Sequence, residues 1–546
     1  MRQGAHARLD LGRFALCRCP SFWELMSQSA PRTPPAVLHL HPTDNVAVAT
    51  RTVPSRSLLD LDGRAIPVLE PIRLGHKVAI EAVPKGHPIR KYGQTIGFAS
   101  EDIAAGAWIH VHNCSADLFE RDYAFASEVR DVETATETRY FRGYRRSDGR
   151  AATRNYVAVI STVNCSATTS RAIADRFRGD ALRAYPNVDG IVPITHKGGC
   201  AMQYGGPDHA QLERVLAGFA RHANVAAYVL VGLGCETGQA SHLIQSQKLV
   251  TLDGIVDSRG SEPPLVITIQ EAGGIRKTVE AGVEAVARLL ARVNHVERVP
   301  IPAAELILGT NCGGSDGNSG VTANPALGVA GDLLVAQGGT VILGETPEIY
   351  GAEHLLTRRA VTRAVGEKLI ERIRWWEWYT SIFGAEINNN PSPGNKDGGL
   401  TTIYEKSLGA VAKGGSTPLT AVYGYAEPVS ARGFVVMDTP GYDPTSMTGI
   451  VAGGANVCVF TTGRGSVYGC KPSPSIKVAT NTPLYERMID DMDINAGVIL
   501  DGTPLQEVGR AIFEEILAVA SGKQTKSELA GVGEEEFSPW QVGPVL

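Results

Sequence analysis

The sequence predicts an α/β protein in which a small β-rich module is followed by two α/β regions with largely parallel sheets. Short apolar runs broken by Gly and Pro fill residues 37–115, without a long amphipathic helix. From residue 143 onward, strand-like runs, glycine-rich loops and helical stretches alternate, which is typical of a parallel sheet flanked by helices. The length of 546 residues agrees with two to four domains.

The first module is expected to contain short strands, for example at residues 45–49, 77–80, 95–99 and 108–112. Residues 1–36 precede it and are expected to form a disordered extension, with Met26 as an alternative start of translation. Residues 116–142 follow it. They are dominated by charged and polar side chains and are expected to form an interdomain linker.

The two α/β regions are expected to be a second domain over residues 143–300 and a C-terminal domain over residues 301–546. Predicted strands follow one another at residues 156–163, 190–195, 226–233, 305–309 and 340–344. Helices are expected between them, for example at residues 283–293 and 326–336. Ligands of such sheets bind at the carboxyl ends of the strands, so a site is expected in the loops there.

Composition excludes several classes of protein. The net charge of −5, without a basic stripe, argues against a nucleic-acid partner. No apolar run is long enough for a membrane span. The nine cysteines are odd in number and scattered, which indicates a cytoplasmic protein without a disulfide framework. An acidic substrate would have to be held by a local group of Lys and Arg side chains.

Cysteines follow four of the predicted strands, where a ligand would bind: Cys165, Cys200, Cys235 and Cys312. Each could be a small buried apolar residue, as free cysteine commonly is. Alternatively, they ligate a metal, or one of them is a nucleophile beside His196 or His209. No CxxC pair is present, so a zinc ribbon is not expected.

Glycine-rich loops with amide, hydroxyl and cationic side chains are candidates for binding a polyhydroxy carboxylate, although ordinary turns share this composition. The candidate substrate-binding residues are Arg154, Asn155, Ser315, Asp316, Asn389, Lys396, Thr462, Arg464 and Lys477. Arg464 is the first choice, because a planar guanidinium can grip a carboxylate with two hydrogen bonds. The alternative is that Arg464 pairs with an acid such as Asp438.

The first module carries candidate catalytic residues of its own: His41, Asp44, His76 and Lys91. His110 and His112 are two apart on a predicted strand, so they would point to one face and could bind a metal; a surface pair is the alternative. Glu345 and Glu348 follow a strand and could supply carboxylates to a base or a hard metal, or a Glu could simply be favoured near a helix N-terminus.

Long motifs resemble one family. In the first module, "HPTDNVAVA", "GHKVAI" and "IHVHN" are similar to the SAF domain, a β-clip-like fold, of altronate dehydratases. Further on, "GLGCET", "CGGSDGNSGVTANPALG", "NPSPGNKDGGLTTIYEKSLG" and "FTTGRGSVYG" resemble the altronate/galactarate hydro-lyases. The resemblance extends from about residue 37 to 520, and "HVHN" resembles the altronate branch.

The resemblance implies a metal-dependent dehydratase that converts a sugar acid, with D-altronate as the first choice, to a 2-keto-3-deoxy acid. Galactarate and sulfolactate are alternative substrates within the family, and a cysteine-nucleophile hydrolase is the alternative of another class. The implied metal is iron(II) (Fe2+), or manganese(II) (Mn2+). It would stabilise the charge that forms when the C2 proton is removed, while a general base and a general acid move protons. The expected partners are a small-molecule sugar acid and further copies of the chain in a homo-oligomer.

Overall fold

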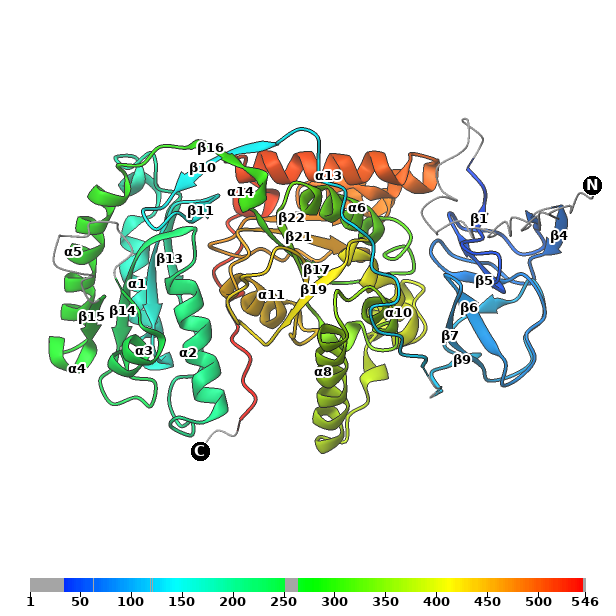
Figure 1. Cartoon of the computed structure of the whole chain (residues 1–546), viewed down its shortest axis with the longest axis horizontal. Coiled ribbons are helices and arrows are strands. Elements are labelled where there is room, and N and C mark those ends of the chain that lie inside the picture. The colour runs from blue at the N-terminus through cyan, green and yellow to red at the C-terminus, as the bar shows by residue number, and fades with distance from the viewer. Residues whose placement is uncertain (1–33, 62, 118, 120, 251–263, 544–546) are drawn as a thin grey trace, which may run out of the picture.

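The computed structural model describes residues 34–61, 63–117, 119, 121–250 and 264–543. They form three bodies in a row (Figure 1). The N-terminal β module and the second domain lie at opposite ends, and the C-terminal domain lies between them. The predicted fold class is confirmed: a β module precedes two domains with parallel sheets. Most of the expected disordered extension, with Met26, lies outside the described residues.

The N-terminal module consists of short strands joined by turns. They are β1 (Val37–Leu38), β2 (Val46–Ala49), β3 (Leu58–Leu61), β4 (Arg64–Pro67), β5 (Lys77–Ala79), β6 (Pro88–Lys91), β7 (Gln94–Ala99), β8 (Trp108–Ile109) and β9 (Cys114–Ser115). They form a sheet in the order β1-β2-β5-β8, a sheet β6-β7-β9 and the hairpin β3-β4. Apolar side chains of the module, such as Ala47, Ile72 and Val78, pack into a core of its own.

The strand expected at residues 108–112 ends at Ile109 instead. The chain turns there, because the side chain of Asn113 accepts a hydrogen bond from the N–H of His110 (2.9 Å). The N–H of Asn113 in turn donates to the carbonyl of His110 (3.1 Å). His110 and His112 therefore lie in a turn, and the prediction that both point to one face of a strand was wrong.

The segment expected to be a linker passes along the C-terminal domain, where Arg121 forms an ion pair with Glu353 (2.8 Å). Its last residues belong to a strand, β10 (Tyr140–Arg145). This strand pairs with β11 (Ala151–Ala152) and with β16 (Val299–Pro302) in an antiparallel sheet. The expected boundaries at residues 142 and 300 therefore fall within paired strands, which connect the second and C-terminal domains (Figure 1).

The second domain is a parallel sheet covered on both faces. Its strands are β12 (Tyr156–Ser161), β13 (Gly190–Ile194), β14 (Val225–Gly232) and β15 (Leu265–Thr268), in the order β13-β12-β14-β15. Helices α1 (Ala167–Ala174) and α5 (Ile275–Val293) pack on one face, and α2 (Pro207–Ala220) and α3 (Ala240–Gln247) on the other; α4 (Ile269–Ala272) precedes α5. Every residue of β14 is buried, which explains its uninterrupted apolar run.

The C-terminal domain is built on a seven-stranded parallel sheet in the order β19-β20-β18-β17-β21-β22-β23. The strands are β17 (Ile307–Cys312), β18 (Thr340–Leu343), β19 (Leu419–Tyr423), β20 (Gly433–Met437), β21 (Val457–Thr462), β22 (Ser475–Ala479) and β23 (Ile494–Asn495). The helices are α6 (Ala323–Ala336), α7 (His354–Arg358), α8 (Arg363–Ile382), α9 (Pro393–Asp397), α10 (Ile403–Val411), α11 (Asp443–Ala452), α12 (Thr482–Arg487), α13 (Leu505–Ala520) and α14 (Lys526–Leu529).

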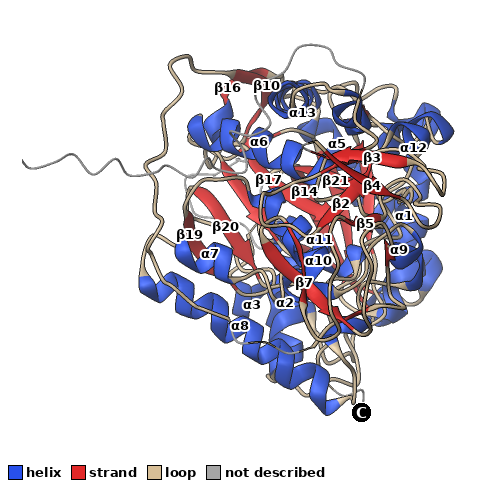
Figure 2. Cartoon of the chain, turned by 90° about the vertical axis from the view of Figure 1, so that its right-hand side faces the viewer, coloured by secondary structure: helices blue, strands red, loops and turns tan. Residues whose placement is uncertain are grey.

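Helices cover both faces of this sheet. Helices α6 and α13 pack on one face, and α11 packs on the other, where it also contacts α2 of the second domain. Figure 2 shows α13 and α8 on opposite sides of β19 and β20. Throughout the described residues, no helix is both long and apolar enough to cross a membrane.

The strand order reverses at β17, since the next strand, β18, lies on one side of it and β21 lies on the other. At such a switch point the loops after neighbouring strands lead away in opposite directions and leave a crevice where ligands bind. We therefore expect a ligand site in the loops after β17 and β21.

Candidate active site

Four loops meet at the carboxyl edge of the C-terminal sheet, after β17, β18, β20 and β21. The N–H groups of Gly463 and Arg464 donate to the carbonyl of Gly314 (3.0 and 2.8 Å). The N–H of Thr346 donates to the carbonyl of Thr439 (3.0 Å). These hydrogen bonds hold the polar side chains of the four loops in one region.

Two buried lysine–glutamate pairs lie in this region. Lys413 Nζ contacts Glu345 Oε2, and Lys406 Nζ lies 2.8 Å from Glu348 Oε1. Burial raises the pKa of the Glu345 carboxyl, and the charge of Lys413 opposes this effect. Glu345, an expected catalytic residue, is fully enclosed with its lysine, whereas Glu348 and Lys406 lie slightly nearer to the surface.

Asp443 is an acid of this region that the sequence reasoning missed. It begins α11, and its Oδ1 accepts a hydrogen bond from Asn311 Nδ2 (3.0 Å). Burial and the negative charge of Glu348 raise the pKa of Asp443 to about 6, against the opposing charge of Lys406. A carboxyl group with such a pKa can take up and release a proton near neutral pH.

We call Asn311, Glu348, Lys406 and Asp443 the acid–base site. Two of its buried acceptor atoms, Asn311 Oδ1 and Glu348 Oε2, have no hydrogen-bond partner within the described structure. An unpaired buried acceptor costs free energy, so a donor from a ligand would be bound favourably there. Hydroxyl groups of a polyhydroxy compound are suitable donors.

Arg464 lies at the switch point, in the loop after β21. Its Nη2 donates to Asp397 Oδ2 (2.9 Å), and its side chain is 47% exposed. Asp397 also lies 3.5 Å from Arg73 of the N-terminal module. Asp438, the acid named as an alternative partner for Arg464, instead accepts hydrogen bonds from a threonine and a tryptophan.

Five further residues that were expected to bind substrate lie at the same edge: Ser315 and Asp316 in the loop after β17, Asn389 in a 3-10 helix, Lys396 in α9 and Thr462 at the end of β21. Three of them make hydrogen bonds that stabilise the loops. Asp316 accepts hydrogen bonds from Thr480 and Asn481 (3.0 and 3.1 Å). The Thr462 hydroxyl accepts from two backbone N–H groups, and the Ser315 hydroxyl lies 2.7 Å from Cys312 Sγ. Lys396 is half-buried and Asn389 is exposed.

The structure does not bring Arg154, Asn155 and Lys477 to this edge. Arg154 and Asn155 precede β12 and so lie at the amino end of that strand, away from the carboxyl edge. The Arg154 guanidinium pairs with Glu528 (2.7 Å), and Lys477 Nζ donates to the hydroxyl of Ser527 (2.7 Å). Because Ser527 and Glu528 belong to α14, both cations stabilise the packing of that helix, and the expectation that they bind substrate is corrected.

A buried ion triad joins the N-terminal module to the C-terminal domain. Lys77 and Lys91 of the module lie 2.8 and 2.9 Å from the two carboxylate oxygens of Glu405 in α10. Burial alone would raise the pKa of Glu405, but the attraction of the two lysines outweighs it and holds the pKa well below its usual range. Lys91 was expected to be catalytic. Its ammonium group is enclosed in this triad, so we correct its role to that of a structural cation.

His76 lies beside Asp397 in the contact between module and domain. Its Nδ1 accepts a hydrogen bond from Trp108 Nε1 (3.1 Å), and its Nε2 lies 3.2 Å from the carbonyl of Asp397. Burial lowers the pKa of His76 to about 4, so the ring is neutral near pH 7. A neutral ring whose Nδ1 accepts carries its proton on Nε2, which therefore donates to Asp397.

The other candidates of the module do not form a metal site. The rings of His110 and His112 lie 4.9 and 5.2 Å from that of Trp108. No compact set of three His, Cys, Asp or Glu ligand atoms in the described chain includes either histidine. His41 Nδ1 contacts the Thr43 hydroxyl, and Asp44 accepts two backbone N–H groups at the turn after β6, so both stabilise turns.

The four candidate cysteines fall into two groups. Cys165, Cys200 and Cys235 are exposed at the carboxyl ends of β12, β13 and β14, whereas Cys312 is buried in the C-terminal domain. His196 is buried, and its Nε2 lies 3.0 Å from the carbonyl of Ser161. No hydrogen bond joins a cysteine to a histidine anywhere in the described residues, so the geometry of a cysteine nucleophile with its base is not present.

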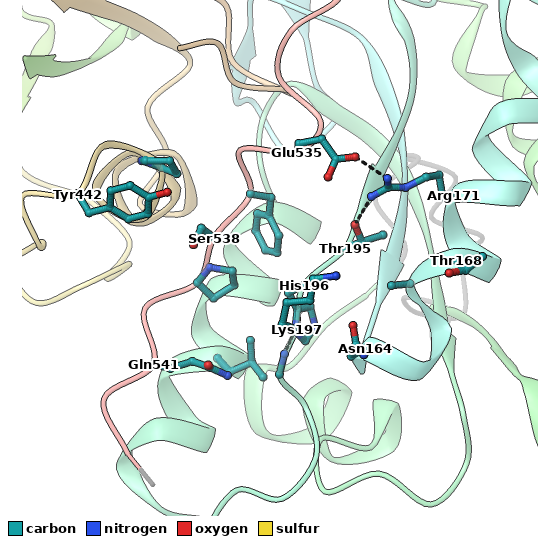
Figure 3. A pocket seen from close by; sticks show the side chains of 16 residues that line it. Asn164, Thr168, Arg171, Thr195, His196, Lys197, Tyr442, Glu535, Ser538 and Gln541 are labelled. Atoms are coloured by element: carbon teal, nitrogen blue, oxygen red, sulfur yellow. Dashed lines mark hydrogen bonds and ion pairs between the residues drawn. The ribbon is translucent and has the colours of Figure 1, made fainter. Parts of the chain in front are cut away.

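A cavity of 670 Å³ lies between the second and C-terminal domains (Figure 3). Asn164, Arg171 and Lys197 line it from the second domain, and Tyr442 and Pro444 line it from the start of α11. In Figure 3 the guanidinium of Arg171 points toward Glu535 and Thr195. Tyr442 and Pro444 flank Asp443 in the sequence, but none of the four residues of the acid–base site lines this cavity.

Comparisons with known families match three successive segments of the chain to domains of one family. Residues 35–117 match the altronate/galactarate dehydratase SAF domain, residues 143–294 the second domain of D-galactarate dehydratase/altronate hydrolase, and residues 303–545 the D-galactarate/altronate dehydratase C-terminal domain. The chain is 34% identical to altronate dehydratase of Bacillus subtilis, over 90% of this chain and 96% of that protein. It is 33% identical to altronate dehydratase of Escherichia coli, with the same coverage. It is 38% identical to galactarate dehydratase (L-threo-forming) of E. coli, over 89% of this chain and 93% of that protein.

Proposed function

The chain belongs to the altronate/galactarate dehydratase family and is a hydro-lyase, and from this premise we propose that it dehydrates D-altronate to a 2-keto-3-deoxy acid. The acid–base site supports this proposal, because it combines a carboxyl group that titrates near neutral pH, a lysine and unpaired acceptors for hydroxyl groups. Galactarate is the second candidate, favoured by the 38% identity to the relative of that name.

The chain's own residues account for binding. Arg464 grips the carboxylate of the acid, since a guanidinium offers parallel N–H donors that match two carboxylate oxygens. The hydroxyl groups of the substrate donate to Asn311 Oδ1 and Glu348 Oε2, the two unpaired acceptors. Long-range attraction contributes little, because the protein has a net charge of −5 and salt screens exposed charges beyond about 8 Å.

Two proton transfers complete the reaction. The Asp443 carboxylate takes the proton from C2, and the electron pair of that bond forms the C2–C3 double bond. The C3–O bond breaks, and the hydroxyl leaves as water with a proton from Lys406. The enol product then gains a proton at C3 and becomes the 2-keto-3-deoxy acid. Glu348 lies 2.8 Å from Lys406 and holds the ammonium group in place.

The iron that the resemblance implies is part of this proposal. The three exposed thiols of the second domain, Cys165, Cys200 and Cys235, are a donor set that iron accepts, whereas His110 and His112 are not assembled with other ligands. Iron bound there would act as a Lewis acid toward a carboxylate or hydroxyl oxygen. We also propose a cytoplasmic location and a homo-oligomer; light scattering measures the oligomeric state.

Replacing Arg464 by Lys is expected to lower kcat/KM by one to three orders of magnitude, roughly 1.4–4 kcal/mol, because the charge stays but the paired N–H donors are lost. The matched control is Arg73→Lys, which changes the other arginine that contacts Asp397 and should leave kcat/KM within about twofold. Equal kinetics for both variants would remove Arg464 from the substrate site.

The proposed function is tested with a panel of sugar acids. Iron-loaded protein is incubated with D-altronate, galactarate, other aldonates and sulfolactate, and 2-keto-3-deoxy acid or sulfite is measured. We expect D-altronate to be turned over most efficiently, and prior treatment with a chelator to abolish the activity. Turnover of galactarate alone would select the second candidate, and no turnover of any acid would contradict the proposal.

A further inference from the structure

Three cysteines of the second domain differ from the other free cysteines that the structure describes. Cys165, Cys200 and Cys235 are exposed, whereas the others are buried: Cys114, Cys312, Cys458 and Cys470. Free cysteine is among the residues most often found in protein interiors. Three exposed thiols in one domain therefore call for an explanation other than packing.

Strand register places the three thiols at the same edge of the sheet. Ser161 pairs with Val231, and Cys165 and Cys235 each lie four residues beyond those partners. Cys200 follows β13, the neighbour of β12 on its other side. The three cysteines thus end three adjacent parallel strands, which lie about 4.8 Å apart.

The loops that carry the cysteines are bonded to one another. The N–H of Asn164 donates to the carbonyl of Gly198 (3.0 Å), and the N–H of Gly238 donates to the carbonyl of Gly199 (2.9 Å). Gly199 has a φ of +95°, and a Cβ built on it would lie 2.3 Å from the carbonyl oxygen of Thr162. Only glycine allows so close an approach, which fixes the Cys200 loop against the Cys165 loop.

The N-termini of helices α1 and α3 favour negative charge in the loops that carry Cys165 and Cys235. Helix α1 begins at Ala167, two residues after Cys165, and α3 begins at Ala240, five residues after Cys235. The dipole of each helix points its positive end toward the loop that precedes it, where thiolates would be stabilised. Lys197 lies three residues before Cys200 and is exposed beside the same loops.

A single metal ion does not fit the three thiols. Sulfur ligands around one tetrahedral ion, with bonds of ~2.3 Å, lie about 3.8 Å apart. Within the described part of the chain, the only set of three His, Cys, Asp or Glu ligand atoms less than 4.8 Å apart is His209, Glu213 and His242. At least one pair of the three sulfurs is therefore more than 4.8 Å apart. In an iron–sulfur cluster each thiolate binds a different iron atom, which calls for such wider spacing.

We propose that Cys165, Cys200 and Cys235 bind a 4Fe–4S cluster in which one iron has no protein ligand. Assembly takes ferrous and ferric iron in equal amounts, together with sulfide, and releases the three thiol protons. No further oxidant is needed, because the two forms of iron supply the charge of the cluster. The cluster acts through Lewis acidity and does not change oxidation state in the reaction.

The open iron would take an oxygen ligand from the cavity between the domains. Asn164 and Gly198, which line that cavity, lie one and two residues before Cys165 and Cys200. Arg171 and Lys197 add positive charge to its wall, which suits a carboxylate. The geometry thus points to a polyhydroxy acid that reaches the open iron through one of its hydroxyl oxygens; this part rests on the proposed function.

The test uses the full chain, purified without oxygen and incubated with iron and sulfide. We expect about four iron and four acid-labile sulfide atoms per chain, with the visible absorption of an iron–sulfur cluster. Reduction by one electron should give an electron paramagnetic resonance signal. Each of Cys165→Ser, Cys200→Ser and Cys235→Ser should lose most of the sulfide, whereas Cys470→Ser, a buried cysteine of the C-terminal domain, should keep it. Circular dichroism checks that all four variants are folded.

Two results would contradict the proposed cluster. One is iron bound without sulfide, and the other is sulfide retained in Cys165→Ser, Cys200→Ser and Cys235→Ser at the level of Cys470→Ser. Formation of the cluster without turnover of any sugar acid would leave the cluster in place and contradict only the proposed function. Addition of D-altronate should shift the resonance signal of the reduced cluster. An unchanged signal during active turnover would show that the open iron does not contact the substrate.

Discussion

Replacement of Asp443 by Asn is expected to lower kcat by about 10²–10⁴-fold while the protein remains folded. The amide keeps the shape of the side chain and can still bond to Asn311, but it cannot accept the C2 proton. The matched control is Asp208→Asn, which changes an acid in the first turn of α2, outside the acid–base site, and should keep the rate. A kcat above one tenth of the wild-type value in Asp443→Asn, with the control active, would show that another group is the base.

The titration of the Asp443 carboxyl group predicts how the reaction rate and the folding stability depend on pH. Because burial raises the pKa of Asp443 to about 6, the wild-type rate should rise with pH through 6 as the base loses its proton. Stability should change in the opposite direction, since a raised pKa means that the folded state holds the proton more tightly. The protonated Asp443 carboxyl contributes its full stabilisation of the folded state below pH 3.8, and this stabilisation is lost as pH rises through about 6. Both effects should be absent in Asp443→Asn, as kcat and melting curves against pH would show.

The second large effect is expected for Glu405→Gln, which should destabilise the protein by about 3–5 kcal/mol. The change leaves the buried ammonium groups of Lys77 and Lys91 without their carboxylate, at the contact between the N-terminal module and the C-terminal domain. Hydrogen exchange should increase first in β5 and β6, the strands that carry these lysines. Chemical denaturation followed by fluorescence measures the loss of stability.

The control for this prediction is Glu514→Gln, which breaks an exposed ion pair with Arg139 and should cost less than about 1 kcal/mol. The pKa of Glu405 is held below its usual range, so its contribution to stability is present above pH 4.5 and is lost as pH falls toward the lowered pKa. Wild type should therefore lose stability in acid more steeply than Glu405→Gln does. Equal stability of both variants at pH 7 would show that the triad does not hold the module.

Local sequence patterns were sufficient to predict the architecture. The uninterrupted apolar runs of β12 and β14 are buried on both sides, and the glycine-rich loops follow strands as expected. Boundaries that depend on a single side chain were not predictable. The hydrogen bond of Asn113 that ends β8 is one example, and it removed the geometric argument for His110 and His112.

The acid–base site was only partly predictable, because long-range contacts decide the role of each polar residue. Arg154 was taken for a substrate ligand, yet its partner is Glu528, 374 residues away. Asp443 and Lys406 were missed, although both lie close to the strand ends of the C-terminal sheet. The loop after β20 was a usable signal, since an acid that begins a helix at a strand end lies where ligands bind.

The central claim, that this enzyme removes water by taking the C2 proton and releasing the C3 hydroxyl, is tested most directly by nuclear magnetic resonance in D2O. The iron-loaded enzyme is incubated with D-altronate, or with whichever acid the panel selects. We predict a 2-keto-3-deoxy product with one deuterium at C3, because the enol gains its proton from solvent. A product without deuterium at C3, or one that keeps the original hydrogen of C2, would contradict the mechanism.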